Sequence, residues 1–200
     1  MTEKEAISAR HSVRHYKDLP IEESKCSELR KLIDECNSSS GLNIQLVLDD
    51  PECFKTLMNR YGWITGAKNY IALIGKKSNT NLDEICGYYG QKLVLAAQML
   101  GLNTCWIAGT YKKGKCSATL SSDEKIVCII SIGYGENQGV EHKSKPLEKL
   151  CNVASAELAS KPEWFQQGID AALKAPTAMN QQKFYLLTWC PRESSCFILL

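Results

Sequence analysis

The 200-residue sequence predicts an α+β fold, in which helices and strands alternate along the chain. Apolar residues recur with the spacing of a helix face in several segments, and two short runs are apolar throughout, as buried strands are. The composition suits a folded core, because 44% of the residues are hydrophobic and 23% are charged. No apolar run approaches the roughly 18 residues that a membrane helix needs. We therefore expect a globular protein that does not cross a membrane.

The first elements are predicted to be helical. Thr2 and Glu5 have the spacing of a capping box, which would open a short helix to about Arg10. After Pro20, a second helix is predicted by apolar residues on one helical face, namely Leu29, Leu32, Ile33 and Cys36. We expect this helix to end in the serine- and glycine-rich turn of residues 37–41.

The longest predicted helix lies in the middle of the chain. An apolar stripe runs from about residue 81 to Leu100, and Gly101 follows in the position of a C-terminal cap. We expect residues 101–109 to form a loop after it. Three shorter elements precede the helix: a strand at 44–48, a short helix at 52–60 and a buried strand at 70–75.

The last third of the chain is predicted to contain one more helix between two strands. Ser160 and Glu163 have capping-box spacing, and Pro162 suits the first helical position. In order, we expect the most apolar strand at 126–132, a charged connector at 136–149, the helix ended by Pro176, and a final strand at 184–189.

Charge and cysteine content exclude several classes of function. The net charge of +2 is far from the basic excess of a general nucleic-acid surface. The ten cysteines show no closely spaced pair of the kind that zinc sites use, so we expect no metal site. The N-terminus has no apolar segment of a secretory signal, which favours reduced thiols and a cytoplasmic location.

Two short segments of the chain resemble each other. Residues 36–45 align with 173–182 at an offset of 137, the distance from Gln45 to Gln182, and this alignment also pairs Asn43 with Asn180. Each segment follows an amphipathic helix and leads into an apolar strand. Short alignments of small and polar residues also arise by chance. The functional interpretation is an internal pseudo-two-fold repeat with two related half-sites.

Four segments carry residues suited to a ligand. Arg10 and Arg14, with Ser12 between them, offer the donors that a phosphate recruits, although basic residues at a helix end also complement its dipole. Asn180 and Gln182 present amide donors and acceptors suited to a heterocycle, or they stabilise an ordinary turn. The third segment has small residues near 109 that would bring backbone amides close to a ligand, or its tryptophan simply packs in the core. The fourth segment has the cations of the connector, which suit an anion or simply lie in a solvated loop.

Together and in this order, these segments resemble the nitroreductase family of FMN-dependent oxidoreductases. The matches are Arg10, Ser12, Arg14 and Tyr16 for the opening motif, residues 101–109 for a Gly-Leu-x-x-Cys-x-Ile-x-Gly loop, 132–134 for Ile-Gly-Tyr, and Lys143 and Lys145 for a basic pair before Pro-Leu-Glu. The resemblance covers roughly residues 3–187. It implies a mixed, mainly antiparallel central sheet flanked by helices.

The sequence departs from the family in one arrangement. The motif Ala-Pro-Ser/Thr-x-x-Asn-x-Gln ordinarily follows the second helix, but here it stands at 175–182. This resembles a subgroup in which one chain contains two half-units, at about 1–110 and 111–189 of a domain spanning 1–189, before an atypical tail at 190–200. The resemblance implies a monomer with an internal pseudo-dimer, or a homodimer.

The resemblance further implies the chemistry. A hydride would pass from NADH or NADPH through FMN to nitro compounds, quinones or similar small electrophiles, by a ping-pong mechanism without a catalytic side chain. A flavin-binding storage or sensing protein with little turnover, and a plain interaction domain, are the alternatives. The implied cofactor-binding residues are Arg10, His11, Ser12, Arg14, Trp106, Ile107, Ala108, Gly109, Lys143, Lys145, Pro176, Thr177, Asn180 and Gln182.

Overall fold

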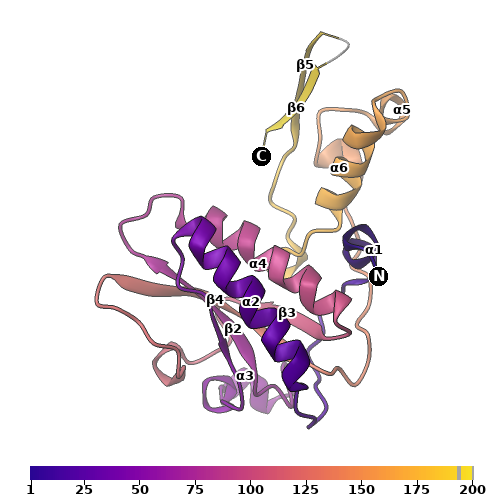
Figure 1. Ribbon diagram of the computed structural model, residues 1–200. Helices are drawn as coiled ribbons and strands as arrows, with labels where there is room; N and C mark the ends of the chain where they lie inside the picture. The colour runs from indigo at the N-terminus through magenta and orange to yellow at the C-terminus, as the bar shows by residue number, and fades with distance from the viewer. Residues whose placement is uncertain (193–194, 200) are drawn as a thin grey trace. The chain divides into compact units, whose positions relative to one another are not determined.

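The computed structural model describes the backbone of residues 1–192 and 195–199 and the side chains of residues 1–187. The chain forms two compact units, Met1–Val140 and Glu141–Leu200 (Figure 1). This α+β architecture agrees with the fold class predicted from the sequence. The predicted half-units at 1–110 and 111–189 stay a prediction, because compactness does not test a repeat.

The first unit contains a four-stranded antiparallel sheet in the order β1-β2-β4-β3. The strands are β1 (Gln45–Val47), β2 (Tyr70–Lys76), β3 (Asn103–Ile107) and β4 (Glu124–Gly133). The two apolar runs therefore form the central strands, as predicted. Strand β3 corrects a prediction that was wrong, since we expected its residues to form a loop. It is the edge strand of this sheet, next to β4, and three polar or partly exposed residues mask its apolar pattern.

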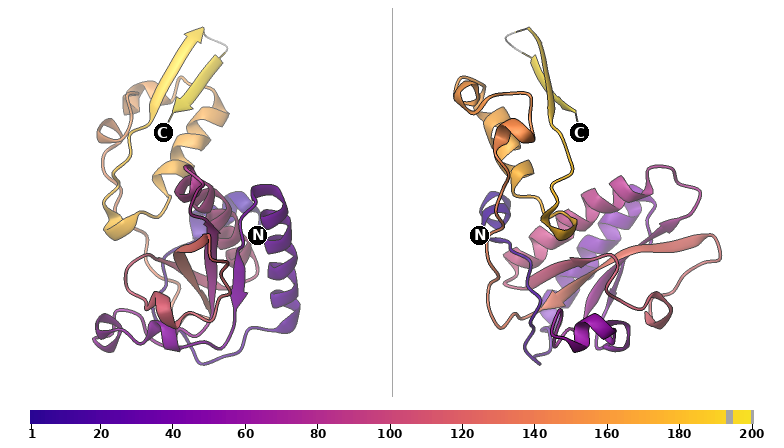
Figure 2. Two further views of the ribbon diagram at one scale, coloured as in Figure 1. Left: turned by 90° about the vertical axis from the view of Figure 1, so that its left-hand side faces the viewer. Right: turned by 180° about the vertical axis from the view of Figure 1, so that it is seen from behind.

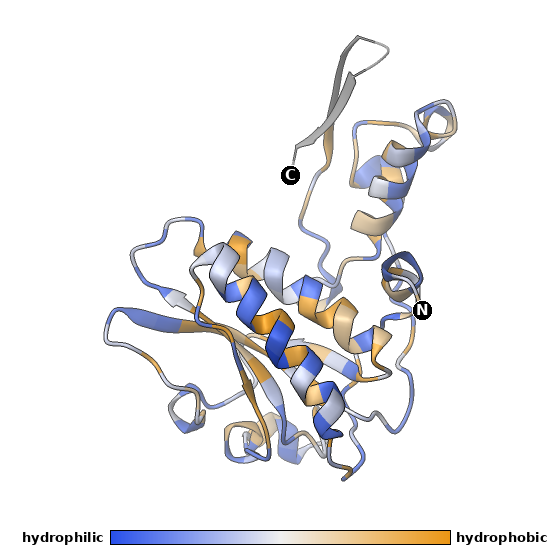
Figure 3. Ribbon diagram, viewed as in Figure 1, coloured by the Kyte–Doolittle hydropathy of each residue, from blue (hydrophilic) through white to orange (hydrophobic). Residues whose placement is uncertain are grey.

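The central strands are apolar throughout because both faces of the sheet are covered. On β2, Ile71 and Leu73 face a core shared with the long helices, whereas Tyr70, Ala72 and Ile74 face a second core. Helices α2 (Glu23–Ser40) and α4 (Leu82–Met99) lie side by side over the first face (Figure 1). Figure 3 shows apolar residues along these strands and helices.

The opposite face is covered by short elements rather than by one helix. We expected a single helix at 52–60, but a 3-10 helix (Glu52–Phe54) and the four-residue helix α3 (Leu57–Arg60) occur there, on the side of the sheet away from α2 (Figure 2). The break has a local cause, since the Thr56 hydroxyl accepts a hydrogen bond from the Asn59 backbone at 3.3 Å and caps a new helix.

The N-terminal helices largely follow their sequence signals. Helix α1 (Glu3–Ala9) has the predicted capping box between Thr2 and Glu5. Helix α2 continues through the serines that we expected to be a turn, because their hydroxyls donate to carbonyls four residues earlier and so remain compatible with a helix. It ends at Gly41, whose φ of 71° is left-handed. Gly101, with φ of 75°, follows α4 in the same way.

The second unit contains helices α5 (Ser155–Leu158) and α6 (Glu163–Leu173) and the antiparallel strands β5 (Leu187–Arg192) and β6 (Ser195–Leu199). The predicted capping box of α6 is wrong, because the Ser160 hydroxyl donates to the Glu157 carbonyl at 2.7 Å instead, and Pro162 is the cap residue itself. Strand β5 begins later than predicted. In the predicted tail at 190–200, residues 193, 194 and 200 lie outside the described residues.

Candidate functional site

Residues 10–16 form an extended strap across the first unit. The Val13 amide donates to the Thr104 carbonyl on β3 at 3.0 Å. Farther along, Thr65 donates to the Arg14 carbonyl and accepts from the Tyr16 amide, both at 2.9 Å. The strap is therefore fixed from two sides, and it places the predicted anion-binding residues beside β3.

The two guanidinium groups of the strap have different environments. Arg10 is only 5% exposed, and burial lowers the pKa of its guanidinium. Arg14 is exposed, and its guanidinium lies 5.7 Å from the centre of the Trp63 ring, which is a cation–π contact. Ser12, between them, forms a parallel bridge with Thr104. The strap thus combines one buried and one accessible cation around a hydroxyl.

The strap is anchored by a buried tyrosine. The Tyr16 hydroxyl lies 2.8 Å from the Ser131 hydroxyl, and Ser131 in turn donates to the Cys105 carbonyl at 3.3 Å. Burial raises the pKa of Tyr16 strongly, so the phenol stays protonated. This chain of hydrogen bonds joins the strap to β4 and β3 through the core.

Cys105 lies between the strap and the sheet and is 5% exposed. Burial raises the pKa of its thiol, while the charge of Arg14, a hydrogen bond with Ser12 and the charge of Arg10 oppose that shift. The thiol is therefore protonated near neutral pH and is a poor nucleophile. Its surroundings fit a packing role.

Replacing Cys105 is expected to affect stability more than turnover. Cys105→Ala removes one buried sulfur atom and should lower the free energy of unfolding by about 1 kcal/mol. Denaturant unfolding and steady-state turnover measure the two effects. Complete loss of turnover in a folded variant would contradict the packing role.

Residues 106–109 occupy the end of β3 and the turn after it. The Trp106 indole donates to the Gln91 side chain at 3.3 Å and packs against the core that contains α4. A Cβ atom on Gly90 would lie 2.4 Å from this ring, so the glycine makes room for it. Ile107 is buried, whereas Ala108 and Gly109 are exposed. The exposed backbone of this segment is thus limited to its last two residues.

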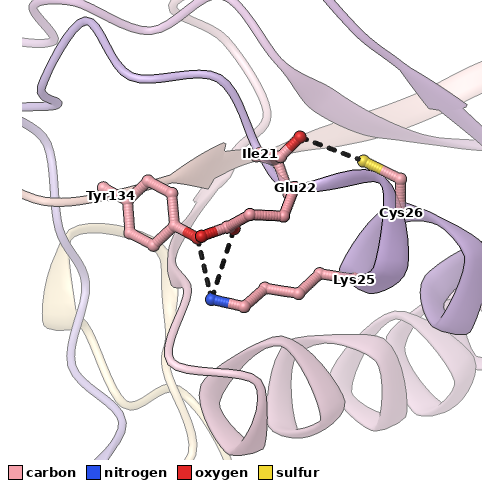
Figure 4. Close-up of polar contacts among 5 residues, drawn as sticks. All are labelled: Ile21, Glu22, Lys25, Cys26 and Tyr134. Atoms are coloured by element: carbon pink, nitrogen blue, oxygen red, sulfur yellow. Dashed lines mark hydrogen bonds and ion pairs between the residues drawn. The ribbon is translucent and has the colours of Figure 1, made fainter.

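Tyr134, in the predicted Ile-Gly-Tyr segment, ties the end of β4 to the start of α2 (Figure 4). Its hydroxyl accepts a hydrogen bond from the Lys25 ammonium at 2.8 Å and donates to the Glu22 carboxylate. The Lys25 ammonium also lies 4.9 Å from the centre of the Tyr134 ring. These side chains satisfy one another, so the structure gives Tyr134 an anchoring role.

The second unit brings four of the predicted site residues together. The Gln182 side chain accepts from the Lys145 amide at 2.9 Å and donates to the Lys143 carbonyl at 3.0 Å. Asn180 donates to the same Lys143 carbonyl at 3.0 Å. The Lys143 and Lys145 side chains are exposed, and no carboxylate pairs with either among the residues whose side chains are described.

The segment before Gln182 is unusual in its backbone. Met179, Asn180 and Gln182 have φ angles of 52°, 53° and 47°. The Thr177 hydroxyl accepts from the Gln182 amide at 3.1 Å. Pro176 follows α6, as predicted, and both Pro176 and Thr177 are partly exposed. A left-handed stretch of non-glycine residues is held here by side-chain hydrogen bonds.

A cavity of about 400 Å³ lies elsewhere in the first unit, and no sequence pattern predicts it. Its lining includes Phe54, Asn59, Arg60 and Lys68, but none of the predicted site residues. Asn59 donates to the Phe54 and Thr110 carbonyls, and its Oδ1 atom is buried without a hydrogen-bond partner in the described structure.

Sequence reasoning also missed Trp63, Thr65 and Thr104, which contact the strap only through tertiary pairing.

Three further observations concern the described residues. No three His, Cys, Asp or Glu side chains gather as a metal ion would require within the described part. No described helix has both the length and the apolar character needed to cross a membrane. Eight cysteines of the described side chains carry free thiols, and all but Cys116 are buried.

Comparisons with known proteins identify a family and a fold for this chain. A family model described as "Putative TM nitroreductase" matches residues 3–189. Among solved structures, a putative nitroreductase from Thermotoga maritima is similar with a TM-score of 0.64 and 20% identity, over 94% of this chain and 71% of that chain. A comparison with curated proteins found no match.

Two further solved structures cover most of their own length. A putative nitroreductase from Desulfovibrio desulfuricans, in complex with FMN, has a TM-score of 0.56 and 20% identity, over 75% of this chain and 95% of that chain. A putative NADH dehydrogenase/NAD(P)H nitroreductase from Parabacteroides distasonis has a TM-score of 0.56 and 22% identity, over 75% and 97%. These likenesses confirm the predicted type of fold.

Proposed function

Because this chain belongs to the family described as "Putative TM nitroreductase", we propose that it is an FMN-dependent oxidoreductase that uses NADH or NADPH. Bound FMN would supply the redox chemistry, taking a hydride and passing it to nitro compounds, quinones or similar small electrophiles in a ping-pong cycle. The observation that carries the proposal is the family match over residues 3–189. The FMN complex of the Desulfovibrio desulfuricans protein, which shares the fold, supports the choice of cofactor.

The donors in the first unit suit a phosphate monoester. Arg14 is exposed and carries no ion pair within the described residues, and Ser12 adds a hydroxyl on the same strap. Guanidinium and hydroxyl donors give short, charge-assisted hydrogen bonds to phosphate oxygens. We assign phosphate binding to Arg10, His11, Ser12 and Arg14, and contact with the flavin ring to the segment of residues 106–109.

The second unit supplies a second set of donors. Lys143 and Lys145 present two exposed ammonium groups on a connector whose backbone is fixed by Asn180 and Gln182. We propose that these lysines bind the FMN phosphate, and that Pro176, Thr177 and Asn180 contact the ribityl chain or ring. No side chain acts as a nucleophile or general base in this proposal, in line with the protonated Cys105.

Purified protein tests the proposal directly. We expect it to bind FMN, to bleach the flavin colour on addition of NADH or NADPH without oxygen, and to regain the colour with a nitroaromatic or a quinone. Flavin that binds but is not reduced would support the storage or sensing alternative. Protein that binds no flavin would contradict both and leave an interaction domain.

The stoichiometry of FMN tests the internal repeat. We propose one FMN per chain, because residues 39–45 lack the proline of the motif at 175–182. Flavin absorbance against protein concentration measures this ratio, and two FMN per chain would contradict it. The mass of the FMN-bound protein in solution then separates a monomer from a homodimer. The free thiols support a reducing compartment such as the cytoplasm.

A further inference from the structure

The two Asn-x-Gln segments, residues 43–45 and 180–182, make matching hydrogen bonds within their own units. In each, the glutamine Nε2 donates to the Oδ1 atom of the asparagine two residues earlier, at 3.1 Å for Gln45 and 2.9 Å for Gln182. Each glutamine also forms hydrogen bonds to a remote backbone segment, through both the nitrogen and the oxygen of its side-chain amide. We call this arrangement the amide clamp.

The backbone that each clamp holds is different. Gln45 donates to the Thr119 carbonyl at 2.7 Å and accepts from the Thr119 amide at 2.9 Å. Gln182 spans two residues, donating to the Lys143 carbonyl at 3.0 Å and accepting from the Lys145 amide at 2.9 Å. In both clamps the asparagine donates to the carbonyl that its glutamine also holds. The two clamps therefore share a hydrogen-bond pattern but hold backbone of different geometry.

Only the second clamp lies in strained backbone. Four non-glycine residues have positive φ in the described chain, and three of them lie in residues 179–182, namely Met179, Asn180 and Gln182. This conformation is unfavourable for a residue that carries a Cβ atom, because the Cβ atom comes too close to the following carbonyl oxygen. Just before the first segment only Gly41 is left-handed, with φ of 71°. Glycine has no Cβ atom and adopts this conformation without strain. The surrounding hydrogen bonds therefore hold the second segment in a conformation that its sequence disfavours, which is typical of functional sites.

The Gln182 amide has no donor left for a ligand. Its side chain is 3% exposed, and its two N–H groups are directed at the Lys143 carbonyl and the Asn180 side chain. Its oxygen accepts from the Lys145 amide. The sequence-based expectation that Gln182 contacts FMN itself therefore has a competing interpretation, in which Gln182 acts on the lysine connector.

We propose that Gln182 is a positioning residue for phosphate recognition: its amide clamp fixes the backbone of residues 143–145 so that the Lys143 and Lys145 ammonium groups bind the phosphate of FMN. This inference rests on the proposed function. The Lys145 ammonium donates to the Gln181 carbonyl at 2.5 Å, which orients it toward the clamp and leaves further donors on the same group.

The test compares FMN with riboflavin, which lacks the phosphate. Gln182→Ala should weaken FMN binding about tenfold, the equivalent of one hydrogen bond to a charged group. Riboflavin binding should weaken less than FMN binding, because riboflavin has no phosphate for the lysine connector to bind, so the FMN-to-riboflavin affinity ratio falls. Flavin fluorescence titration measures both affinities. Gln45→Ala removes the matching clamp in the first unit and is the control, for which the ratio should stay at the wild-type value.

A second variant and a combination keep the test decisive if Gln182→Ala does not fold. Gln182→Met keeps the length of the side chain and adds no charge, but it loses both donors and the acceptor of the amide, and it should lower the ratio in the same direction. In a Lys143→Ala/Lys145→Ala background, either change at Gln182 should cause no further loss of FMN affinity. An unchanged ratio in a folded Gln182 variant, or losses that add fully to those of the lysines, would overturn the inference. Wild-type protein that binds no FMN would instead reject the proposed function.

Discussion

Removing the two connector lysines is expected to weaken FMN binding by at least about 100-fold, because two hydrogen bonds to a charged group are together worth roughly 3 kcal/mol. Lys143→Ala/Lys145→Ala removes two exposed ammonium groups and leaves the backbone atoms that the amide clamp holds. Riboflavin affinity should stay near the wild-type value. Fluorescence titration at two salt concentrations measures the effect, and the FMN affinity of the variant should depend less on salt than that of the wild type.

The matched control for this variant is Lys149→Ala/Lys161→Ala. It removes two lysines of the same unit that carry no ion pair within the described residues. Net charge changes equally, so a general electrostatic effect would weaken FMN binding in both variants alike. Equal losses would refute a specific phosphate site on the connector.

The largest loss of stability is expected at Gly66. A Cβ atom there would lie 2.1 Å from the Tyr16 carbonyl oxygen, and the backbone φ is 69°. Gly66→Ala should therefore lower the free energy of unfolding by at least about 3 kcal/mol, through left-handed strain and overlap with fixed backbone. Because Thr65 pairs with the strap on both sides of residue 15, the variant should also lose FMN affinity.

Gly62 provides the control for Gly66. Its φ is 82°, but a Cβ atom there would meet nothing within 4 Å. Gly62→Ala should cost only the left-handed strain, about 1 kcal/mol, and leave FMN affinity unchanged. Urea unfolding of both variants gives the comparison. Similar losses at the two glycines would show that close approach to Tyr16 does not matter.

Sequence reasoning predicted the elements whose signals are local. The apolar runs at β2 and β4, the stripe of α4 and the capping box at Thr2 each depend on neighbours in the chain, and each is confirmed. Strand β3 was missed because an edge strand has a weaker pattern. The capping box at Ser160 was wrong because the hydroxyl has a competing acceptor in the Glu157 carbonyl, three residues earlier.

The candidate site was predictable in its residue types but not in its contacts. The arginines and lysines were found from their spacing and from the resemblance to a family. Their supports come from tertiary structure: Thr104 and Thr65 hold the strap, and Gln182 holds the connector. A periodic sequence pattern cannot show that a glutamine side chain forms a hydrogen bond to the backbone 37 residues away. The role of Gln182 therefore became visible only in the structure.

The central claim is that this chain carries one FMN that a nicotinamide reduces. The most direct measurement mixes the FMN-bound protein with NADH, and separately with NADPH, in a stopped-flow instrument without oxygen. We expect loss of the flavin absorbance in a phase whose amplitude equals one FMN per chain, with at least one of the two nicotinamides. Flavin that stays oxidised with both nicotinamides would contradict it.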